Sequence, residues 1–436
     1  MSNDTRSRPV PSSRLSRAAR LGGLGAQVLG AMAGGATRQM VAGQRPRARD
    51  LLLTPANAAR LTNELSRMRG AAMKMGQLLS MESADLLPPE LAQILSRLRA
   101  DAHHMPPKQL KQVLIQAYGA DFLRLFQRFD VRPVASASIG QVHRVVARDG
   151  RELALKIQYP GVRAAIDADV ANLGALLRMS GLIPKGIDIA PLLEEARKQL
   201  HEEADYPREA REMRAFGGYL AGDAMLAVPG VHDDLSTGDI LAMDFMPGQP
   251  IETLAEADQA TRDHIAEALF ALFLRELFDW GHVQTDPNFA NYLFDPGSGR
   301  LTLLDFGAAR RFDGPAVARF RALMRATLNN DPASLRDAMQ SLGYLRAQTP
   351  PDQVQTVLDM AARIGAALRL GVVDFGDTRL LEDLRKTGER LGLEQGYREV
   401  PQIDALFMQR KLAGLVLLAT RLRARVGVTA LVEPRL

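Results

Sequence analysis

The spacing of hydrophobic positions changes character several times along the 436 residues. From about residue 54 to 130, apolar residues recur at three- and four-residue spacing, which predicts helices; the first begins at Thr54-Pro55, a typical N-cap and first-turn pair. Between 131 and 158 the pattern alternates, turns at Asp149-Gly150 and resumes, which predicts a β-hairpin. A helical segment is therefore expected to precede a strand-rich one.

The remaining chain returns mostly to helical periodicity. Residues 160 to 220 are predicted helical, 226 to 246 contain a strand ending in ILAMDFM, and 258 to 280 form a long apolar helix. The stretch YLFDPGSGRLTLL indicates two short strands joined by Pro-Gly-Ser-Gly, and after Asp305-Phe306-Gly307 the chain is predicted to be mostly helical to its end. This succession predicts an α+β fold without internal repeats.

Composition narrows the possible classes of protein. A hydrophobic content of 46% with 24% charged residues is ordinary for a folded globular chain. The absence of cysteine excludes disulfides, thiolate zinc sites and a cysteine nucleophile. The seven histidines show no metal-binding spacing, and we interpret most of them as surface or loop residues.

The positive charge is concentrated in the first fifty residues, which hold nine Arg and two Asp. This segment has no aromatic residue, so anionic lipid is a more plausible partner than nucleic acid. Its uncharged run at 21–36 is too short and too glycine-rich for a transmembrane helix, although Gly30 and Gly34 form a GxxxG. The pattern leaves open a membrane-contacting or self-associating helix and a plain soluble helix or loose arm.

One spacing points to chemistry. Asp286 and Asn291 are five residues apart, and Asp305-Phe306-Gly307 follows fourteen residues after Asn291. A protein kinase has an acceptor-side Asp, a metal-binding Asn and a DFG motif in this order, although Gln284-Thr285 replaces the usual His-Arg. A second DFG at Asp374 follows no such loop, and we interpret it as a loop.

The predicted hairpin carries the other parts of a phosphotransfer site. Lys156 lies late in its second strand, where a kinase places a phosphate-binding lysine, but a solvent-facing strand lysine is the plainer alternative. Glu209, in the helical stretch that follows, is the candidate partner of Lys156. The entrance to the hairpin has one glycine where kinases use GxGxxG, so it is either a stiffened phosphate cradle or an ordinary serine-rich turn. This entrance to the hairpin consists of Ala135, Ser136, Ala137, Ser138, Ile139, Gly140, Gln141 and Val142.

A further motif gives the chain a resemblance to a known family. The stretch MRGAAMKMGQLLSM contains Lys74, Gly76 and Gln77, and it resembles the KxGQ motif of the UbiB or AarF atypical kinases, called ADCK in animals. The similarity extends from about residue 14 to near the C-terminus and includes ASIGQVH, ALKIQYPGV, an ExD motif at Glu203 and Asp205, and QTDPNFAN. The QTDPN spelling is closest to the mitochondrial coenzyme Q branch.

The resemblance implies a bilobal protein-kinase-like α+β fold. Its expected parts are a basic arm at 1–50, a helical KxGQ extension at 51–130, a small lobe with inserted helices at 131–246, and a helix-rich large lobe at 247–436.

It also implies roles for individual residues. Lys156 would contact nucleotide phosphates and pair with Glu209, and residues 135–142 would cover ATP or ADP. Asp286 would be the acceptor-side carboxylate, with Mg²⁺ on Asn291 and Asp305. Asp244 and Met246 would lie at the adenine hinge, and the KxGQ residues would meet Glu203 and Asp205 and obstruct protein substrates.

The implied activity is that of an ATP-dependent atypical kinase or ATPase supporting ubiquinone biosynthesis. Its partners would be anionic membrane lipid and quinone biosynthesis enzymes or lipid precursors, without nucleic acid. It would be cytoplasmic and peripherally associated with a bacterial inner membrane, or with the mitochondrial inner membrane in a eukaryote. Alternatives are a nucleotide-gated scaffold or lipid-handling module without turnover, and a small-molecule phosphotransferase.

Two departures from the family pattern stand out. Ser136 lies where relatives often have alanine. The paired C-terminal transmembrane helices of some bacterial members have no counterpart, because LAGLVLLA is only eight residues long and arginines follow it. The oligomeric state has no signature in the sequence.

Overall fold

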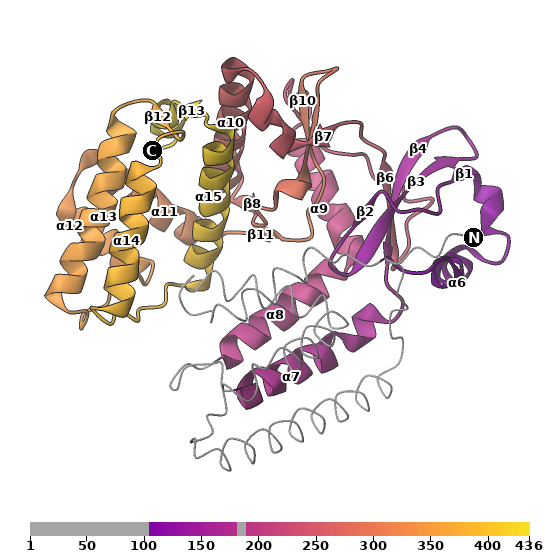
Figure 1. Cartoon of the computed structure of the whole chain (residues 1–436), viewed down its shortest axis with the longest axis horizontal. Helices are drawn as coiled ribbons and strands as arrows, with labels where there is room; N and C mark the ends of the chain where they lie inside the picture. Colours follow the sequence, from indigo (N-terminus) through magenta and orange to yellow (C-terminus); the bar gives the residue numbers. More distant parts are fainter. Residues whose placement is uncertain (1–103, 181–188) are drawn as a thin grey trace, which may run out of the picture. The chain divides into compact units, whose positions relative to one another are not determined.

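The computed structural model describes residues 104–180 and 189–436, which form two compact units (Figure 1). The first unit contains the described residues up to Ala215 together with Pro229–Met246. The second contains Phe216–Val228 and Pro247–Leu436. The predicted arm and the KxGQ residues Lys74, Gly76 and Gln77 lie outside the described residues.

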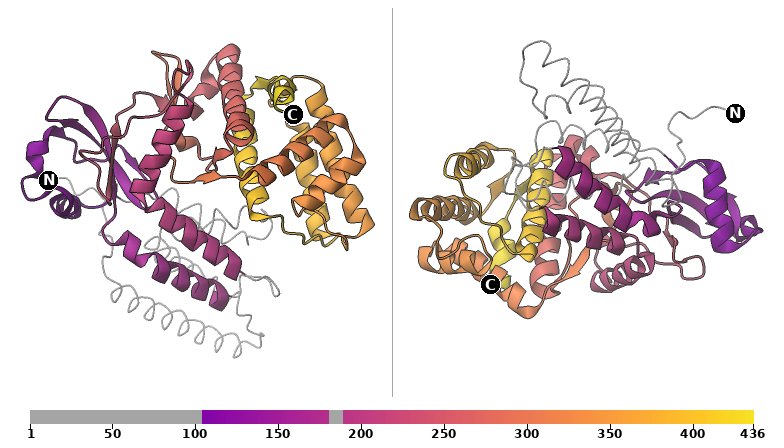
Figure 2. Two further views of the ribbon diagram at one scale, coloured as in Figure 1. Left: turned by 180° about the vertical axis from the view of Figure 1, so that it is seen from behind. Right: turned by 90° about the horizontal axis from the view of Figure 1, so that it is seen from below.

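The first unit is built on a five-stranded antiparallel sheet in the order β1-β3-β4-β6, with β2 also paired to β3. The predicted hairpin is confirmed as β3 and β4, joined by a turn in which Gly150 has a positive φ of 93°. Helices α7 and α8 lie side by side in both Figure 1 and Figure 2. The elements are α6 (Pro107–Tyr118), η1 (Phe122–Leu125), β1 (Phe126–Phe129), β2 (Ala135–Ser136), β3 (Gly140–Ala147), β4 (Glu152–Gln158), α7 (Val162–Ser180), α8 (Ala190–Glu203), α9 (Tyr206–Tyr219), which continues into the second unit, and β6 (Ile240–Asp244).

The helical prediction fails at its C-terminal end, because residues 126–129 form strand β1 rather than helix. The segment FQRF is too short for its periodicity to decide between the two states. Pairing with β3 and edge-to-face packing of Phe126 against Phe129, with ring centroids 5.5 Å apart, favour the strand.

The two faces of β4 have different neighbours. Leu153, Leu155 and Ile157 are fully buried in a core that also contains Leu110 and Leu114 of α6. Burying each of these three side chains contributes on the order of 1.5–3 kcal/mol. The opposite face carries the alternate residues, of which Lys156 and Gln158 make polar contacts with the α8–α9 region. Helices on both faces explain why this strand is buried nearly throughout.

The second unit combines small sheets with helices. Strand β10 pairs in parallel with β5 and antiparallel with β9, which pairs with β7; β8 pairs with β11, and β12 with β13. The elements are β5 (Leu226–Ala227), β7 (Gln249–Pro250), η2 (Ile251–Glu256), α10 (Gln259–Leu274), the π-helical η3 (Arg275–Asp279), β8 (His282–Gln284), η4 (Phe289–Asn291), β9 (Tyr292–Asp295), β10 (Arg300–Leu303), β11 (Ala309–Arg311), α11 (Gly314–Asn329), α12 (Pro332–Ser341), α13 (Pro351–Arg369), β12 (Val373–Asp374), α14 (Arg379–Leu393), α15 (Ile403–Leu422), β13 (Arg425–Val426), α16 (Val428–Val432) and η5 (Glu433–Arg435).

The predicted apolar helix at 258–280 is confirmed as α10 and its π-helical continuation. Asp258 begins it by accepting a hydrogen bond from the backbone N–H of Thr261 at 2.9 Å. The two strands predicted around Pro-Gly-Ser-Gly are β9 and β10. Across the part of the chain that the structure describes, no helix has the length and apolarity needed to cross a membrane.

The interpretation of the second DFG as a loop is wrong in detail. Asp374 of the second DFG lies in the short strand β12 rather than in a loop, and Phe375 stacks on Phe270 at 5.4 Å. His143 and His282 are exceptions to the interpretation of most histidines as surface or loop residues, because both are fully buried in strands. Burial lowers the pKa of His143, which lies within hydrogen-bond distance of the Asp130 carbonyl.

Candidate functional site

Lys156 and Glu209 form a buried ion pair in the first unit. The Lys156 ammonium donates to both carboxylate oxygens of Glu209, at 2.6 and 2.9 Å, and the two side chains are 6% and 1% exposed. Strand β4 supplies the lysine and the first turn of α9 supplies the glutamate. The predicted pairing of these two residues is therefore confirmed, and the alternative of a solvent-facing lysine is excluded.

The entrance to the hairpin is a tight turn closed by hydrogen bonds. Strand β2 pairs with β3, and the Ala137 N–H donates to the Gly140 carbonyl at 2.8 Å. A Cβ at Gly140 would lie 2.5 Å from the Ile157 carbonyl oxygen and 2.8 Å from the Tyr206 hydroxyl. The single glycine of this predicted cradle is thus required by close packing of the backbone.

Side chains of the same turn are engaged within the first unit. The Gln141 amide is fully buried, accepts from the Met105 N–H at 2.8 Å and lies 2.7 Å from the His143 ring. Ser136 contacts the His104 ring at 2.9 Å. Contact between residues 135–142 and a nucleotide would therefore rely mainly on backbone N–H groups.

The two acidic residues of the ExD motif lie at the junction of α8 and α9. Glu203 is the last residue of α8, and its carboxylate accepts a hydrogen bond from the Ser138 hydroxyl. Asp205 accepts from the Arg208 N–H at 3.0 Å at the start of α9. The motif thus contacts the loop predicted to cover the nucleotide. Its predicted meeting with Lys74 and Gln77 stays a prediction, since those residues lie outside the described part.

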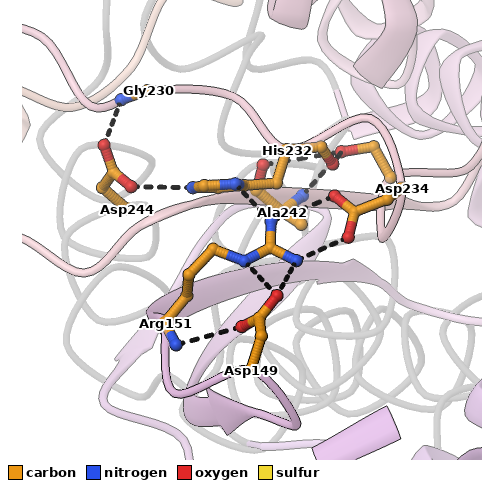
Figure 3. A network of polar contacts seen from close by, with 8 residues as sticks. Asp149, Arg151, Gly230, His232, Asp234, Ala242 and Asp244 are labelled. Carbon is orange, nitrogen blue, oxygen red and sulfur yellow. Dashed lines mark hydrogen bonds and ion pairs between the residues drawn. The ribbon is translucent and has the colours of Figure 1, made fainter.

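Asp244, at the end of β6, belongs to a polar network (Figure 3). Its carboxylate accepts from the Gly230 N–H and from His232 Nε2, both at 2.7 Å. The Arg151 guanidinium lies 2.8 Å from His232 Nδ1, within hydrogen-bond distance. Arg151 also pairs with Asp149 and Asp234, each at 2.6 Å.

This network fixes the end of β6, where the adenine hinge is expected. Both carboxylate oxygens of Asp244 accept hydrogen bonds within the network, so a contact with an adenine base would come from the backbone of the segment leading to Met246. Met246 is the last residue of the first unit.

In the second unit, the acceptor-side and metal-binding candidates lie close together. Asn291 Nδ2 donates to Asp286 Oδ2 at 3.1 Å, which leaves the amide oxygen of Asn291 to face a cation. Asp305 Oδ1 accepts from the Gly307 N–H at 2.9 Å. Asn291 and Asp305 both line one small cavity of about 10 Å³, roughly the space of one water molecule.

The donor set suits Mg²⁺ bound together with a nucleotide. Magnesium is usually held by one or two protein oxygens plus phosphates and waters. In residues 104–180 and 189–436, no three His, Cys, Asp or Glu residues cluster as a self-sufficient metal site. An amide oxygen and a carboxylate are therefore sufficient only where phosphate oxygens complete the coordination.

Gln284 and Thr285, which stand in place of His-Arg, join the loop of Asp286 to the DFG segment. Gln284 Nε2 donates to the Asp305 carbonyl at 3.1 Å. The Thr285 hydroxyl and N–H both donate to the Ala308 carbonyl, at 2.8 and 3.2 Å. Strands β8 and β11 pair beside them. Gln284-Thr285 is thus an intact structural link between the loop of Asp286 and the DFG segment.

Two residues of the site escaped the sequence analysis, namely Arg410 and Lys411 of α15. Arg410 Nη2 pairs with Asp286 Oδ1 at 2.6 Å. The buried Lys411 ammonium donates to Gln284 Oε1 at 3.1 Å and to the Tyr292 hydroxyl at 3.2 Å. These residues lie more than a hundred positions after the loop, so no local spacing could have indicated them.

Lys411 also faces a buried acid. The Glu276 carboxylate lies 3.7 Å from its ammonium, and neither Glu276 oxygen accepts a hydrogen bond from another described side chain. Burial raises the pKa of Glu276 to about 7, although Lys411 acts in the opposite direction. Burial by itself lowers the pKa of Lys411, but Glu276 and Tyr292 raise it above its ordinary value. This pair lines the same cavity as Asn291 and Asp305.

In the first unit, a strand lysine is held by a helix glutamate. In the second unit, Asp286 contacts Asn291, and Gln284 of the same loop contacts Asp305. Both features are those of a protein-kinase-like domain. The comparisons identify the particular kind: residues 97–339 match the ABC1 atypical kinase-like domain. The chain belongs to this ABC1/UbiB family of atypical kinases. The predicted family and kinase-like α+β fold are thereby confirmed.

Several relatives match over nearly the whole chain. The mitochondrial atypical kinase COQ8 of Saccharomyces cerevisiae is 36% identical over 425 residues, 97% of this chain and 84% of that protein. The mitochondrial atypical kinase COQ8B of Rattus norvegicus is 36% identical over 98% of this chain and 81% of its own. Among solved structures, a complex of Rv3197 with erythromycin from Mycobacterium tuberculosis is similar, with 25% identity and a TM-score of 0.60 over 87% of this chain and 96% of that one.

Proposed function

We propose that this protein is a Mg²⁺-dependent atypical kinase or ATPase that supports ubiquinone biosynthesis at a membrane. The observation that carries the proposal is the Asp286–Asn291 contact, joined through Gln284 to the metal-binding candidate Asp305. Asp286 would accept the proton of the attacking hydroxyl or water, and Asn291 and Asp305 would hold the metal. The metal would supply neutralisation of the charge on the phosphates. Lys156, whose ammonium is held by Glu209, would contact phosphate oxygens.

The quinone-pathway assignment rests on the mitochondrial COQ8 relatives and the QTDPN spelling. The partners would be pathway enzymes or lipid precursors, with the chain peripherally attached to a bacterial or mitochondrial inner membrane. The basic residues of 1–50 would provide the attraction to anionic lipid. Deleting residues 1–49 should then weaken binding to anionic vesicles, most strongly at low salt. Equal binding by the shortened and full chains at every salt concentration would refute the role of the arm.

Turnover is tested by measuring ATP hydrolysis of wild type and Asp286→Asn, with anionic liposomes and quinone-precursor phenols added. We expect a fall in kcat of about 10²–10⁴-fold with nucleotide binding retained, because only the proton acceptor is lost. Asp305→Asn should instead weaken Mg²⁺-dependent nucleotide binding. The matched control is Asp374→Asn in the second DFG, whose carboxylate accepts from the Gly376 N–H and pairs with Arg425.

Other outcomes would favour the alternatives. A wild type that binds Mg²⁺-nucleotide but hydrolyses none with any additive would indicate a nucleotide-gated scaffold or lipid-handling module. Turnover that requires a soluble metabolite would indicate a small-molecule phosphotransferase. A wild-type rate equal to that of Asp286→Asn would refute the assignment of Asp286.

The KxGQ residues are proposed to obstruct protein substrates by meeting Glu203 and Asp205. Lys74→Ala should then change nucleotide preference or release autophosphorylation, whereas Lys108→Ala, at an exposed position of α6, serves as a control. Unchanged nucleotide affinity and no new phosphorylation in Lys74→Ala would remove the regulatory role.

A further inference from the structure

One face of α15 contacts three residues of the proposed catalytic loop, namely Gln284, Asp286 and Pro287. Arg410 pairs with Asp286, and the adjacent Lys411 donates to Gln284. One turn later, Gly414 lies against Pro287. Positions 410, 411 and 414 fall on one side of a helix, so a single rigid element contacts the loop on both sides of Asp286.

The contact at Gly414 leaves no room for a side chain. A Cβ at this position would lie 2.1 Å from Pro287 Cβ and 2.7 Å from its Cγ, well inside van der Waals contact. Pro287 directly follows Asp286, and its ring fixes the local backbone. The absent side chain of Gly414 therefore sets how closely the loop approaches α15.

The contact at Arg410 orients the reactive group itself. Asp286 Oδ2 accepts from Asn291, and Oδ1 accepts from Arg410, so both oxygens are held from different directions. The two side chains of the ion pair are 11% and 18% exposed, which limits screening by solvent. On the other side, Lys411 is held between Gln284, Tyr292 and Glu276 and anchors the strand that leads into the loop.

We propose that α15 positions the catalytic loop, with Arg410 and Gly414 as positioning residues that fix the orientation of Asp286. Arg410 acts through Asp286 and supplies a guanidinium beside it from a distant helix, where the loop itself has Thr285. The inference rests on the proposed function for its effect on turnover. The placement of the loop is a separate consequence that can be measured without turnover.

The experiment compares Arg410→Lys, Arg410→Met and Gly414→Ala with wild type in two measurements. The first is hydrogen exchange of peptides covering 284–291, with a peptide from the interior of α10 as the reference for global unfolding. The second is steady-state ATP hydrolysis with nucleotide affinity measured independently. Arg421→Met, at an exposed position of α15, and Gly392→Ala, with nothing within 4 Å of its Cβ, are the matched controls.

We expect exchange in 284–291 to accelerate about tenfold or more in Arg410→Met and Gly414→Ala while α10 stays protected. The kcat should fall by about 10²-fold with nucleotide affinity within a few-fold of wild type, since a small displacement of a reacting group has an effect of that order. Arg410→Lys keeps the charge but loses the planar guanidinium, so it should recover only part of the rate. Both controls should match wild type.

Unchanged loop exchange and unchanged kcat in Arg410→Met and Gly414→Ala would overturn the proposal. Faster exchange of α10 together with the loop would also overturn it, because the residues would then support the whole unit. If wild type shows no hydrolysis, the proposed function fails, and loop exchange alone still decides whether α15 positions the loop.

Discussion

The Lys156–Glu209 pair allows stability and nucleotide binding to be separated. The perturbation is Lys156→Met or Glu209→Gln, each of which leaves one buried group without its partner. Removing one member of a buried ion pair typically costs about 3–5 kcal/mol of unfolding free energy. For a domain of 150–250 residues, each kcal/mol shifts Tm by about 2–4 °C, so a decrease of roughly 6–20 °C is expected.

The double variant Lys156→Met/Glu209→Leu should regain much of this stability, because it removes both charges from a buried site. It should not regain nucleotide binding, since the phosphate-contacting cation is still absent. The assay is thermal denaturation by circular dichroism with and without Mg²⁺-ATP, together with direct nucleotide titration. Arg197→Met, which breaks the exposed pair with Glu194, is the control and should leave Tm close to that of wild type.

Two results would refute this reasoning. A Tm within 1–2 °C of wild type, on the order of the effect of a surface pair, in both single variants would show that the pair contributes little to the fold. Nucleotide-induced stabilisation in the double variant equal to that of wild type would show that Lys156 does not contact phosphate.

Three further predictions concern single residues. Burial raises the pKa of Glu276 to about 7 in the folded state, so its contribution to the unfolding free energy is present below its unfolded pKa and is lost as pH rises through the folded pKa. Across that interval, wild type should lose about 3 kcal/mol relative to Glu276→Gln in urea denaturation. A difference in unfolding free energy between the two proteins that stays constant at every pH would contradict this. Gly140→Ala should cost about 1–3 kcal/mol because its Cβ would collide with backbone, whereas Gly238→Ala, with open space around it, should be near neutral in the same denaturation assay. Gln284→Met leaves Lys411 and the Asp305 carbonyl each short of a partner, so chemical denaturation should show a loss of about 1–3 kcal/mol; a neutral result would mean that the link is dispensable.

Local patterns predicted local structure well. The turn at Asp149-Gly150 needs one glycine with positive φ, and the strands around Pro-Gly-Ser-Gly are bounded by turn residues, so neither depends on distant contacts. The helix beginning after Asp258 carries its own capping residue. In contrast, β1 was predicted as helix, because the state of so short a segment is decided by its neighbours in space. The burial of His143 and His282 likewise depends on packing that no local pattern indicates.

The amino-acid sequence alone was enough to indicate the family and the order of the candidate site residues, because Asp286, Asn291 and Asp305 occur at fixed spacing on one continuous loop and strand pair. It also indicated Lys156 and Glu209, although their contact depends on the packing of α9 against the sheet. Only the tertiary structure could bring Arg410, Lys411 and Gly414 to that loop. Spacing along a chain fixes which residues of one element share a face, whereas the packing of separate elements decides which charge lies beside which carboxylate.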